Sequence, residues 1–579
     1  MITLPRIGHI FRDFYPIMPR IATCLLLSVL LPGFSAPAFS TTAAASAPTG
    51  PAFSHDGLFR LLSAEFAVSR NQPAAALKPY REEALASNDA AVLERALQIA
   101  NYLQDSQAGL ELSDHLTVLQ PENSTAWYQK AFHGLRLQQS DTVMEALGKL
   151  IQLNPEAEIE ALFLSAYPPT PEGRGKMLEA IEQLERRFPQ NSQLLFAHAL
   201  LAGENGQYSI AGDYIRRALA ANPDNIPAIL LQARILGMDN RNREALDVLS
   251  SAVMKYPNSR QVNLHYARML IKAGHPFQAE SRLKQLLERF PADGEILLMH
   301  GLLAYNNQHD PEARRSLEQL VLTGEHEDEA HFYLGMISLR GKDSDQAERH
   351  FEAIGEGPHF LPALSELSGM LASSGRVDEA RRNLAVARQN MPNQAAMLYV
   401  LEAEMLNKVS RHAEAMSLLN EGVDKYPQDN LLLFSRALTA DKLKNLPGFE
   451  KDMQELLSRD PENFSYLNAL GYTLADQTQR FGEAEVYLRK ALRLKPEDPA
   501  VIDSMGWLLY RLGNVNEALE YVQKAFKLFP DEEIGTHLAE ILWVTGKRAE
   551  AAKVWQQLLQ KNPTSELVLK HKAKFEQKP

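Results

Sequence analysis

The chain has 579 residues, 45% of them apolar, and 60 Lys and Arg against 72 Asp and Glu give it a formal net charge of −12. A chain with this excess of acidic residues is poorly suited to bind the phosphate backbone of nucleic acid. We therefore do not expect nucleic acid as a partner. The single cysteine, Cys24, excludes an internal disulfide framework and a cysteine metal site.

Residues 1–38 have the features of a secretory signal peptide. Arg20 precedes an apolar run at residues 21–34, and Ala36-Pro37-Ala38 follows it as an A-x-A cleavage site. The run is shorter than the roughly 20 residues that span a bilayer. We therefore expect export to the periplasm and no transmembrane helix in the mature chain, with association with the outer membrane as an open alternative.

Two details of this leader leave alternatives open. Met18-Pro19-Arg20 would make a complete beginning for the signal, so translation could start at Met18 instead of Met1. A lipoprotein signal places its cysteine after the apolar run, whereas most of the run follows Cys24, so plain secretion is favoured over lipidation. Residues 39–53, rich in Ala, Ser, Thr and Pro, indicate a disordered linker.

From residue 54 onward, prolines recur at the period of a helical hairpin. Pro121, Pro155, Pro189, Pro223, Pro257 and Pro291 are each 34 residues apart, and Pro358, Pro392, Pro427, Pro461, Pro496, Pro530 and Pro563 follow at 33 to 35 after one gap of double length. Proline cannot continue a helix, so a stop that recurs at this spacing indicates one hairpin per period.

The unit that ends at Pro530 shows the pattern most clearly. Two apolar-periodic runs, residues 500–512 and 516–529, are separated by Gly513-Asn514. Gly506 and Ala518 stand 12 residues apart, and pairs of small residues recur at this offset along the chain, where two helices cross. These features are typical of the tetratricopeptide repeat (TPR). We predict an all-α fold, a right-handed TPR α-solenoid superhelix of about 15 helical hairpins.

We expect the repeats to form two arrays, residues 54–358 and 359–563, because Gly355-Glu356-Gly357-Pro358 makes a loose joint between them. Residues 564–579 then form a capping helix and tail. Ser565 can cap this last helix, and its polar outer face would close the array.

No catalytic constellation stands out in the sequence. His326 and His331 flank acidic residues, as in a zinc-protease motif, but they are five residues apart and do not share a helix face. Acidic residues that open a helix are the favoured interpretation. The repeats leave no room for a separate catalytic domain, so we predict a protein that is not an enzyme and needs no metal or cofactor.

The candidate functional site is the surface that first helices present to a groove. The residues predicted to line its C-terminal end are Asn468, Tyr472, Asp476, Asp503, Trp507, Tyr510, Arg511, Glu540 and Trp543. Trp, Tyr and Arg dominate interaction hot spots, so this set favours a peptide or protein ligand. The alternative, which we weigh equally, is that Trp507 and Tyr510 pack between adjacent first helices.

Four stretches carry a family resemblance: LNALGYTLAD (467–476), DSMGWLLYRLG (503–513), HLAEILWVTG (537–546) and HFYLGMIS (331–338). They resemble proteobacterial envelope TPR proteins, and the chain is similar to the outer-membrane lipoprotein adaptor of a periplasmic carboxyl-terminal processing protease. This resemblance implies a scaffold that assembles with the protease, activates it and delivers cell-wall hydrolases to it. The lipobox cysteine of such adaptors is absent here, so anchoring and oligomeric state stay open.

Two other functions remain as alternatives. The first is an assembly factor for outer-membrane or exopolysaccharide export machinery, which also uses periplasmic TPR scaffolds. The second, less favoured, is a peptidoglycan-active enzyme with carboxylates in the groove. Acidic charge and a 34-residue period are compatible with scaffolds of unrelated function, so the sequence does not identify the partner.

Overall fold

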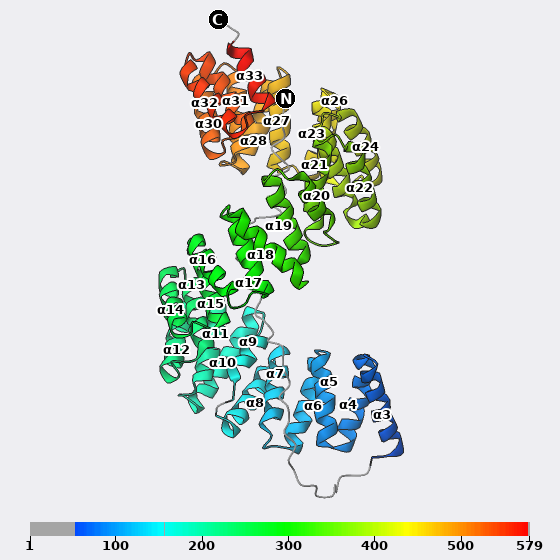
Figure 1. The fold of residues 1–579 in the computed structure, drawn as a ribbon, viewed down its shortest axis with the longest axis vertical. Helices are drawn as coiled ribbons and strands as arrows, with labels where there is room; N and C mark the ends of the chain where they lie inside the picture. Colours follow the sequence, from blue (N-terminus) through cyan, green and yellow to red (C-terminus); the bar gives the residue numbers. More distant parts are fainter. Residues whose placement is uncertain (1–52, 156, 577–579) are drawn as a thin grey trace. The chain divides into compact units, whose positions relative to one another are not determined.

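The computed structural model describes residues 53–155 and 157–576, and the regular elements in these residues are helices (Figure 1). They comprise 31 α-helices, labelled α3 to α33, and one short 3-10 turn, η1. The α-helices pair in chain order as 15 hairpins, from α3/α4 to α31/α32, and α33 follows. The predicted all-α solenoid of about 15 hairpins is confirmed.

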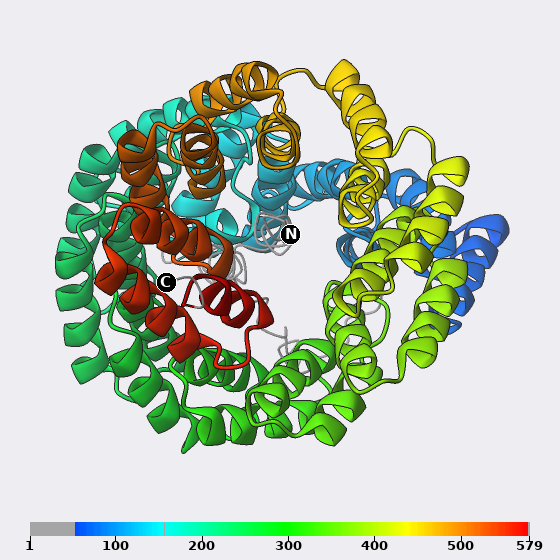
Figure 2. The same ribbon diagram turned by 90° about the horizontal axis from the view of Figure 1, so that it is seen from above.

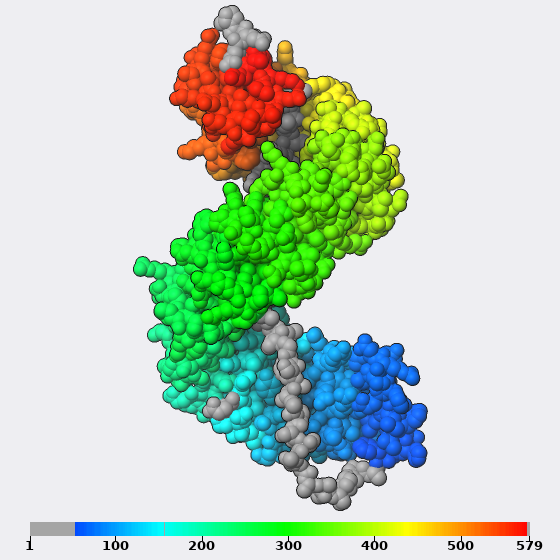
Figure 3. Space-filling view, viewed as in Figure 1, coloured from blue at the N-terminus to red at the C-terminus, as the bar shows by residue number. Residues whose placement is uncertain are grey.

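The described helices fall into two compact units, residues 53–313 and 314–576, and the division lies within α18. Within each unit, consecutive hairpins pack against one another in chain order, as the colours show (Figures 1 and 2). In the space-filling view the C-terminal hairpins form one closely packed orange-to-red body (Figure 3).

The N-terminal unit contains α3 (His55–Ser69), α4 (Pro73–Ser87), α5 (Ala90–Tyr102), α6 (Ser106–Leu119), α7 (Ser124–Arg136), α8 (Ser140–Leu153), α9 (Ile159–Ala166), α10 (Pro171–Arg187), α11 (Ser192–Glu204), α12 (Tyr208–Ala221), α13 (Ile226–Met238), α14 (Asn242–Lys255), α15 (Arg260–Lys272), α16 (Pro276–Leu287), α17 (Gly294–Asn306) and the start of α18 (Asp310–Thr323).

The C-terminal unit continues with α19 (Glu327–Arg340), α20 (Ser344–Glu352), α21 (Phe360–Ser373), α22 (Val377–Asn390), η1 (Pro392–Gln394), α23 (Ala395–Lys408), α24 (His412–Lys425), α25 (Asn430–Lys442), α26 (Leu446–Arg459), α27 (Phe464–Gln477), α28 (Phe481–Leu494), α29 (Pro499–Arg511), α30 (Val515–Leu528), α31 (Glu532–Val544), α32 (Arg548–Lys561) and α33 (Glu566–Glu576).

The predicted signal peptide and nearly all of the predicted linker lie outside the described residues. The division of the repeats at residue 358 stays a prediction. Among the helices that the structure describes, none combines the length and the apolar character needed to cross a membrane.

Small residues stand where the two helices of a hairpin cross. A Cβ added at Gly506 of α29 would lie 2.6 Å from a methyl carbon of Val522 on α30. A Cβ added at Gly471 of α27 would lie 2.7 Å from Cγ of Leu488 on α28. These approaches leave no room for a larger side chain, which explains the 12-residue pairing of small residues seen in the sequence.

Helix ends follow from local chemistry in the same unit. Asp498 is the N-cap residue of α29, and its carboxylate accepts hydrogen bonds from the backbone N–H groups of Ala500 and Val501 at 3.0 Å each. Gly513 follows α29 with φ of 88°, a left-handed conformation that favours glycine. Ser565 caps α33 by accepting from Val568 N at 3.3 Å, as predicted.

Two hairpins are irregular where proline or glycine residues interrupt the sequence. Helix α9 has only eight residues and ends before Pro168-Pro169, and α10 begins at Pro171. Helix α20 has nine residues and is followed by a loop, residues 353–359, that includes the predicted joint. Proline and glycine shorten these helices because they disfavour continued helical backbone.

Candidate functional site

The nine predicted groove residues lie on three consecutive first helices of the C-terminal unit, α27, α29 and α31 (Figure 1). The structure brings eight of them into two adjoining clusters. The ninth, Asn468, is buried, and its side-chain oxygen has no hydrogen-bond partner among the described residues.

The first cluster is centred on His537 of α31, which the sequence analysis did not select. Its Nδ1 lies 2.8 Å from Oδ2 of Asp503 on α29, and its Nε2 lies 3.2 Å from the hydroxyl of Tyr472 on α27. The imidazole stacks on the indole of Trp507, with ring centroids 4.1 Å apart and planes 21° apart. One histidine therefore connects three neighbouring repeats.

Asp476, near the end of α27, adds a second connection to α29. The indole Nε1 of Trp507 donates to Oδ1 of Asp476 at 3.1 Å, and Arg511 donates to the backbone carbonyl of Asp476. The guanidinium also lies over the ring of Phe481, 5.6 Å from its centroid. Together with the preceding contacts, these define the His537 cluster, which comprises Tyr472, Asp476, Asp503, Trp507, Arg511 and His537.

Burial alone would lower the pKa of His537. The carboxylates of Asp503, Glu533 and Asp476 outweigh that effect and raise the pKa to about 9. At neutral pH the imidazole is therefore charged, and both ring nitrogens donate. Burial, with the same carboxylates nearby, holds the pKa of Tyr472 well above its usual value, so its hydroxyl stays protonated.

The raised pKa predicts a loss of stability on the alkaline side. The folded state binds the proton of His537 more tightly than the unfolded chain, whose histidine has a pKa near 6.5. The stabilisation is therefore complete below pH 6.5 and is lost as pH rises through about 9. We expect the free energy of unfolding of the C-terminal unit to fall by about 3 kcal/mol over this range.

Urea unfolding followed by tryptophan fluorescence measures this, because three of the four tryptophans, Trp507, Trp543 and Trp555, lie in the C-terminal unit. The control is His537→Gln, which cannot titrate. An equally steep decline in that variant would show that other groups cause the pH dependence.

The second cluster is centred on Glu540 of α31. Its carboxylate accepts from the hydroxyl of Tyr510 on α29 at 3.3 Å and from Nε2 of His571 on α33 at 3.1 Å. His571 in turn accepts from Nε1 of Trp555 at 3.3 Å, and Trp555 packs against Trp543 with ring centroids 5.5 Å apart. The Glu540 cluster is defined by these residues, Tyr510, Glu540, Trp543, Trp555 and His571. It connects α29, α31 and α33.

Burial would raise the pKa of Glu540, but the hydrogen bond from His571 and the charge of Lys574 outweigh it and lower the pKa. Burial and Glu540 raise the pKa of Tyr510 to about 12. The carboxylate is therefore ionised and the phenol neutral throughout the physiological range, which suits a permanent contact between repeats.

The rings of Trp507 and Tyr510 thus lie between adjacent repeats, as one of the two sequence interpretations proposed. Trp507 is 7% exposed and offers little surface to a partner, whereas Tyr510, Arg511, Asp476 and Trp543 are partly exposed. A role for these partly exposed residues in binding stays a prediction. His537 could have been found from its position 34 residues after Asp503, one repeat further along the same helix face.

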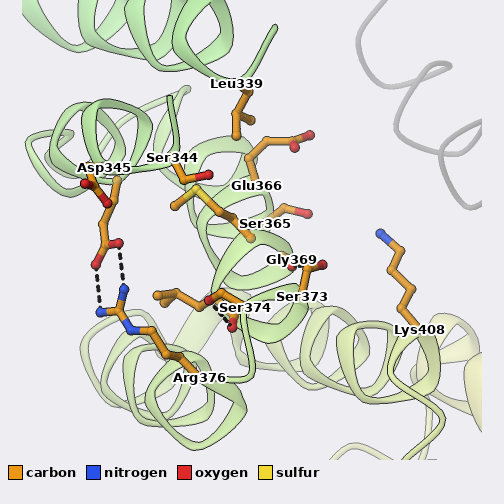
Figure 4. A pocket seen from close by; sticks show the side chains of 13 residues that line it. Leu339, Ser344, Asp345, Ser365, Glu366, Gly369, Ser373, Ser374, Arg376 and Lys408 are labelled. Carbon is orange, nitrogen blue, oxygen red and sulfur yellow. Dashed lines mark hydrogen bonds and ion pairs between the residues drawn. The ribbon is translucent and has the colours of Figure 1, made fainter. Parts of the chain in front are cut away.

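A second candidate site lies over α21, and none of the predicted residues lines it. It is a cavity of about 640 Å³ bounded by the end of α19, by α20 and α21, by the residue that precedes α22 and by the end of α23 (Figure 4). Its lining residues are Leu339, Ser344, Asp345, Glu348, Ser365, Glu366, Gly369, Met370, Leu371, Ser373, Ser374, Arg376 and Lys408. The sequence signal was a run of small residues four apart, Ser365, Gly369 and Ser373, on one face of a helix.

Within the described part of the chain, no group of three or more His, Cys, Asp or Glu side chains is arranged to hold a metal ion. The His537 and Glu540 clusters offer charged groups, hydrogen-bonding groups and partly exposed aromatic rings, and the α21 cavity offers charged and hydrogen-bonding groups.

Comparisons with known proteins agree with the repeat architecture. Tetratricopeptide repeat models match residues 238–304, and also 298–359, 450–499 and 504–566. The chain is 36% identical over 488 residues to the TPR repeat-containing protein PA4667 of Pseudomonas aeruginosa, covering 84% of this chain and 82% of that protein.

More distant similarities extend to eukaryotic proteins. Human tetratricopeptide repeat protein 7B is 21% identical over 362 residues, which cover 61% of this chain and 39% of that protein. Among solved structures, yeast Tom70 is 13% identical and covers 90% of this chain and 95% of its own, with a TM-score of 0.31.

Proposed function

The chain belongs to the tetratricopeptide repeat family, and on that premise we propose that it is a non-enzymatic periplasmic scaffold that binds other proteins. The observation that carries this proposal is the 36% identity to a bacterial TPR protein over 84% of the chain, together with helical hairpins throughout the described residues. Each hairpin uses its apolar face to pack on its neighbours, so the remaining surface is available for partners.

The most concrete form of the proposal is an adaptor that assembles with a carboxyl-terminal processing protease and delivers cell-wall hydrolases to it. The resemblance to envelope adaptors supports it, and the stretches that carry this resemblance include most of the His537 and Glu540 clusters. Arg511, partly exposed at the edge of α29, belongs to the residue types that contribute most to interfaces.

Affinity capture of the mature chain from crosslinked envelopes, read by mass spectrometry, tests this role. We expect the parent chain to recover a carboxyl-terminal processing protease, and Arg511→Gln to recover at least about fivefold less, the effect of an interface arginine. Tyr510→Phe is a second variant for the same capture measurement, because it keeps the ring and removes only the hydroxyl that donates to Glu540.

The matched control is Arg489→Gln, because Arg489 is an exposed arginine of α28 that pairs with Glu485 on its own helix. Recovery of barrel-assembly or polysaccharide-export components without a protease would contradict the adaptor role but not the scaffold. Release of soluble fragments from purified peptidoglycan would contradict a non-enzymatic protein.

A further inference from the structure

Helix packing does not require a glycine in the floor of the α21 cavity. The small residue at the crossing with α22 is Ser368, which stands 12 residues before Ala380 and is fully buried. Gly369 is its neighbour, and a Cβ added there would meet no atom within 4 Å. A glycine in a helix interior weakens the helix relative to alanine. At this position the glycine leaves the cavity open.

Small residues of α21 form the floor of the cavity and carry hydrogen-bond acceptors. Ser365, Gly369 and Ser373 follow at four-residue intervals on α21, between Arg376 and Lys408 in the view of Figure 4. The hydroxyl of Ser373 donates to the carbonyl of Gly369 at 2.7 Å, and that of Ser374 donates to the carbonyl of Leu371 at 2.9 Å. Since their protons are engaged, these oxygens are left to accept from a ligand.

The charge of the cavity is unevenly balanced. Arg376 donates to both carboxylate oxygens of Glu348, at 2.7 and 2.8 Å, and also pairs with Glu379, so its charge is already satisfied. Asp345 and Glu366 form no ion pair with any described residue, and the same holds for Lys408. The cavity therefore keeps two unpaired carboxylates against one unpaired ammonium group.

The helix that carries Lys408 also carries a buried carboxyl group. Glu404 lies one turn before Lys408 on α23, and its Oε1 is buried without a hydrogen-bond partner in the described chain. Burial raises the pKa of Glu404 to about 7 and also raises the pKa of Glu366, and the charge of Lys408 opposes both effects. Lys408 acts against the raised pKa of both carboxyl groups without an ion pair to either, and a further cation would favour their ionised forms.

We propose that this cavity receives a lysine or arginine side chain from an extended segment of a partner protein. The inference rests on the proposed function, because it assigns a ligand to a protein-binding scaffold. The carboxylates of Asp345 and Glu366, which form no ion pair and lie at different edges of the cavity, each offer a place for the cation, and the serine oxygens accept from backbone N–H groups. Leu339, Met370 and Leu371 contact the aliphatic stem of the bound side chain.

Binding of defined peptides to the full mature chain tests the proposal. The probe is fluorescein-labelled Gly-Ser-Ala-Lys-Ala-Ser-Gly, with versions in which arginine, norleucine or glutamate replaces the lysine, measured by anisotropy at low salt. We expect the lysine and arginine peptides to bind about tenfold more tightly than the glutamate peptide, since the contact between the bound side chain and a cavity carboxylate changes from attractive to repulsive. The preference should weaken as salt is raised.

Two kinds of variant locate the binding. Gly369→Leu fills the floor and should weaken the lysine peptide at least tenfold. Gly212→Leu on α12, where an added Cβ also meets nothing within 4 Å, is its matched control. The double variant Asp345→Asn, Glu366→Gln should lose the preference for the lysine peptide over the norleucine peptide. The control Glu318→Gln, which removes an exposed carboxylate of α18, should keep that preference.

Equal affinity for the lysine and glutamate peptides would overturn the inference, as would a Gly369→Leu variant that binds the lysine peptide within twofold of the parent. If Gly369→Leu fails to fold by circular dichroism, the carboxylate variants decide. If the peptides bind but no protease is captured, the adaptor role alone is contradicted. If Gly369→Leu leaves protease capture unchanged and the chain shows no preference among the peptides, the cavity proposal alone is contradicted.

Discussion

Replacing Asp503 by alanine should lower the free energy of unfolding of the C-terminal hairpins by about 3 kcal/mol at pH 7. The substitution leaves the imidazolium of His537 between α27, α29 and α31 without its closest carboxylate, which now lies 2.8 Å from Nδ1. A buried charge that loses its partner costs more than the pair contributed, because nothing replaces the lost solvation.

A double-mutant cycle separates this effect from simple loss of packing. Asp503→Ala combined with His537→Leu removes both charges, so the double variant should be more stable than Asp503→Ala alone. Hydrogen exchange of α29 and α31 amides in the full chain measures the change locally, which suits a repeat array that need not unfold as one unit. A double variant less stable than either single variant would show that the pair is not the cause.

The sequence predicted the repeat architecture well because one physical constraint recurs in every hairpin. Prolines stop the second helices, and the small residues at the crossings, such as Gly506 against Val522, are needed wherever two helices approach closely. Irregular units were also foreseeable, since Pro168-Pro169 cannot continue α9. Periodicity of this kind is local, so it can be read without knowing the tertiary structure.

The candidate site was less predictable, because its partners lie one repeat apart. Trp507 and Tyr510 were predicted to lie on the helix face away from the paired helix, but the contacts that engage them come from Asp476 on the preceding repeat and His537 and Glu540 on the following one. A helical pattern gives the direction of a side chain but not what stands opposite it. The α21 cavity had a weaker signal still, because an open space depends on residues from four helices.

Replacing Trp555 by alanine should destabilise the end of the array by about 3–5 kcal/mol. Its indole is 0% exposed, packs against Trp543 and Phe575, and donates to His571. The final hairpin has a neighbour on one side and only α33 on the other, so the loss should appear as local unfolding of α32 and α33. Trp555→Phe keeps an aromatic ring and should cost less.

This local unfolding would also reach the candidate binding surface. When α33 separates, Glu540 loses His571 and Lys574, which help to hold its pKa down and its side chain in position, so the carboxylate is no longer fixed where it accepts from the hydroxyl of Tyr510 on α29. We therefore expect Trp555→Ala to speed amide exchange in residues 532–576 and to lower capture of a partner that binds beside Arg511. Parent-like exchange in α32 and α33 would contradict the first expectation. Unchanged capture with fast exchange would place the partner on another surface of the array.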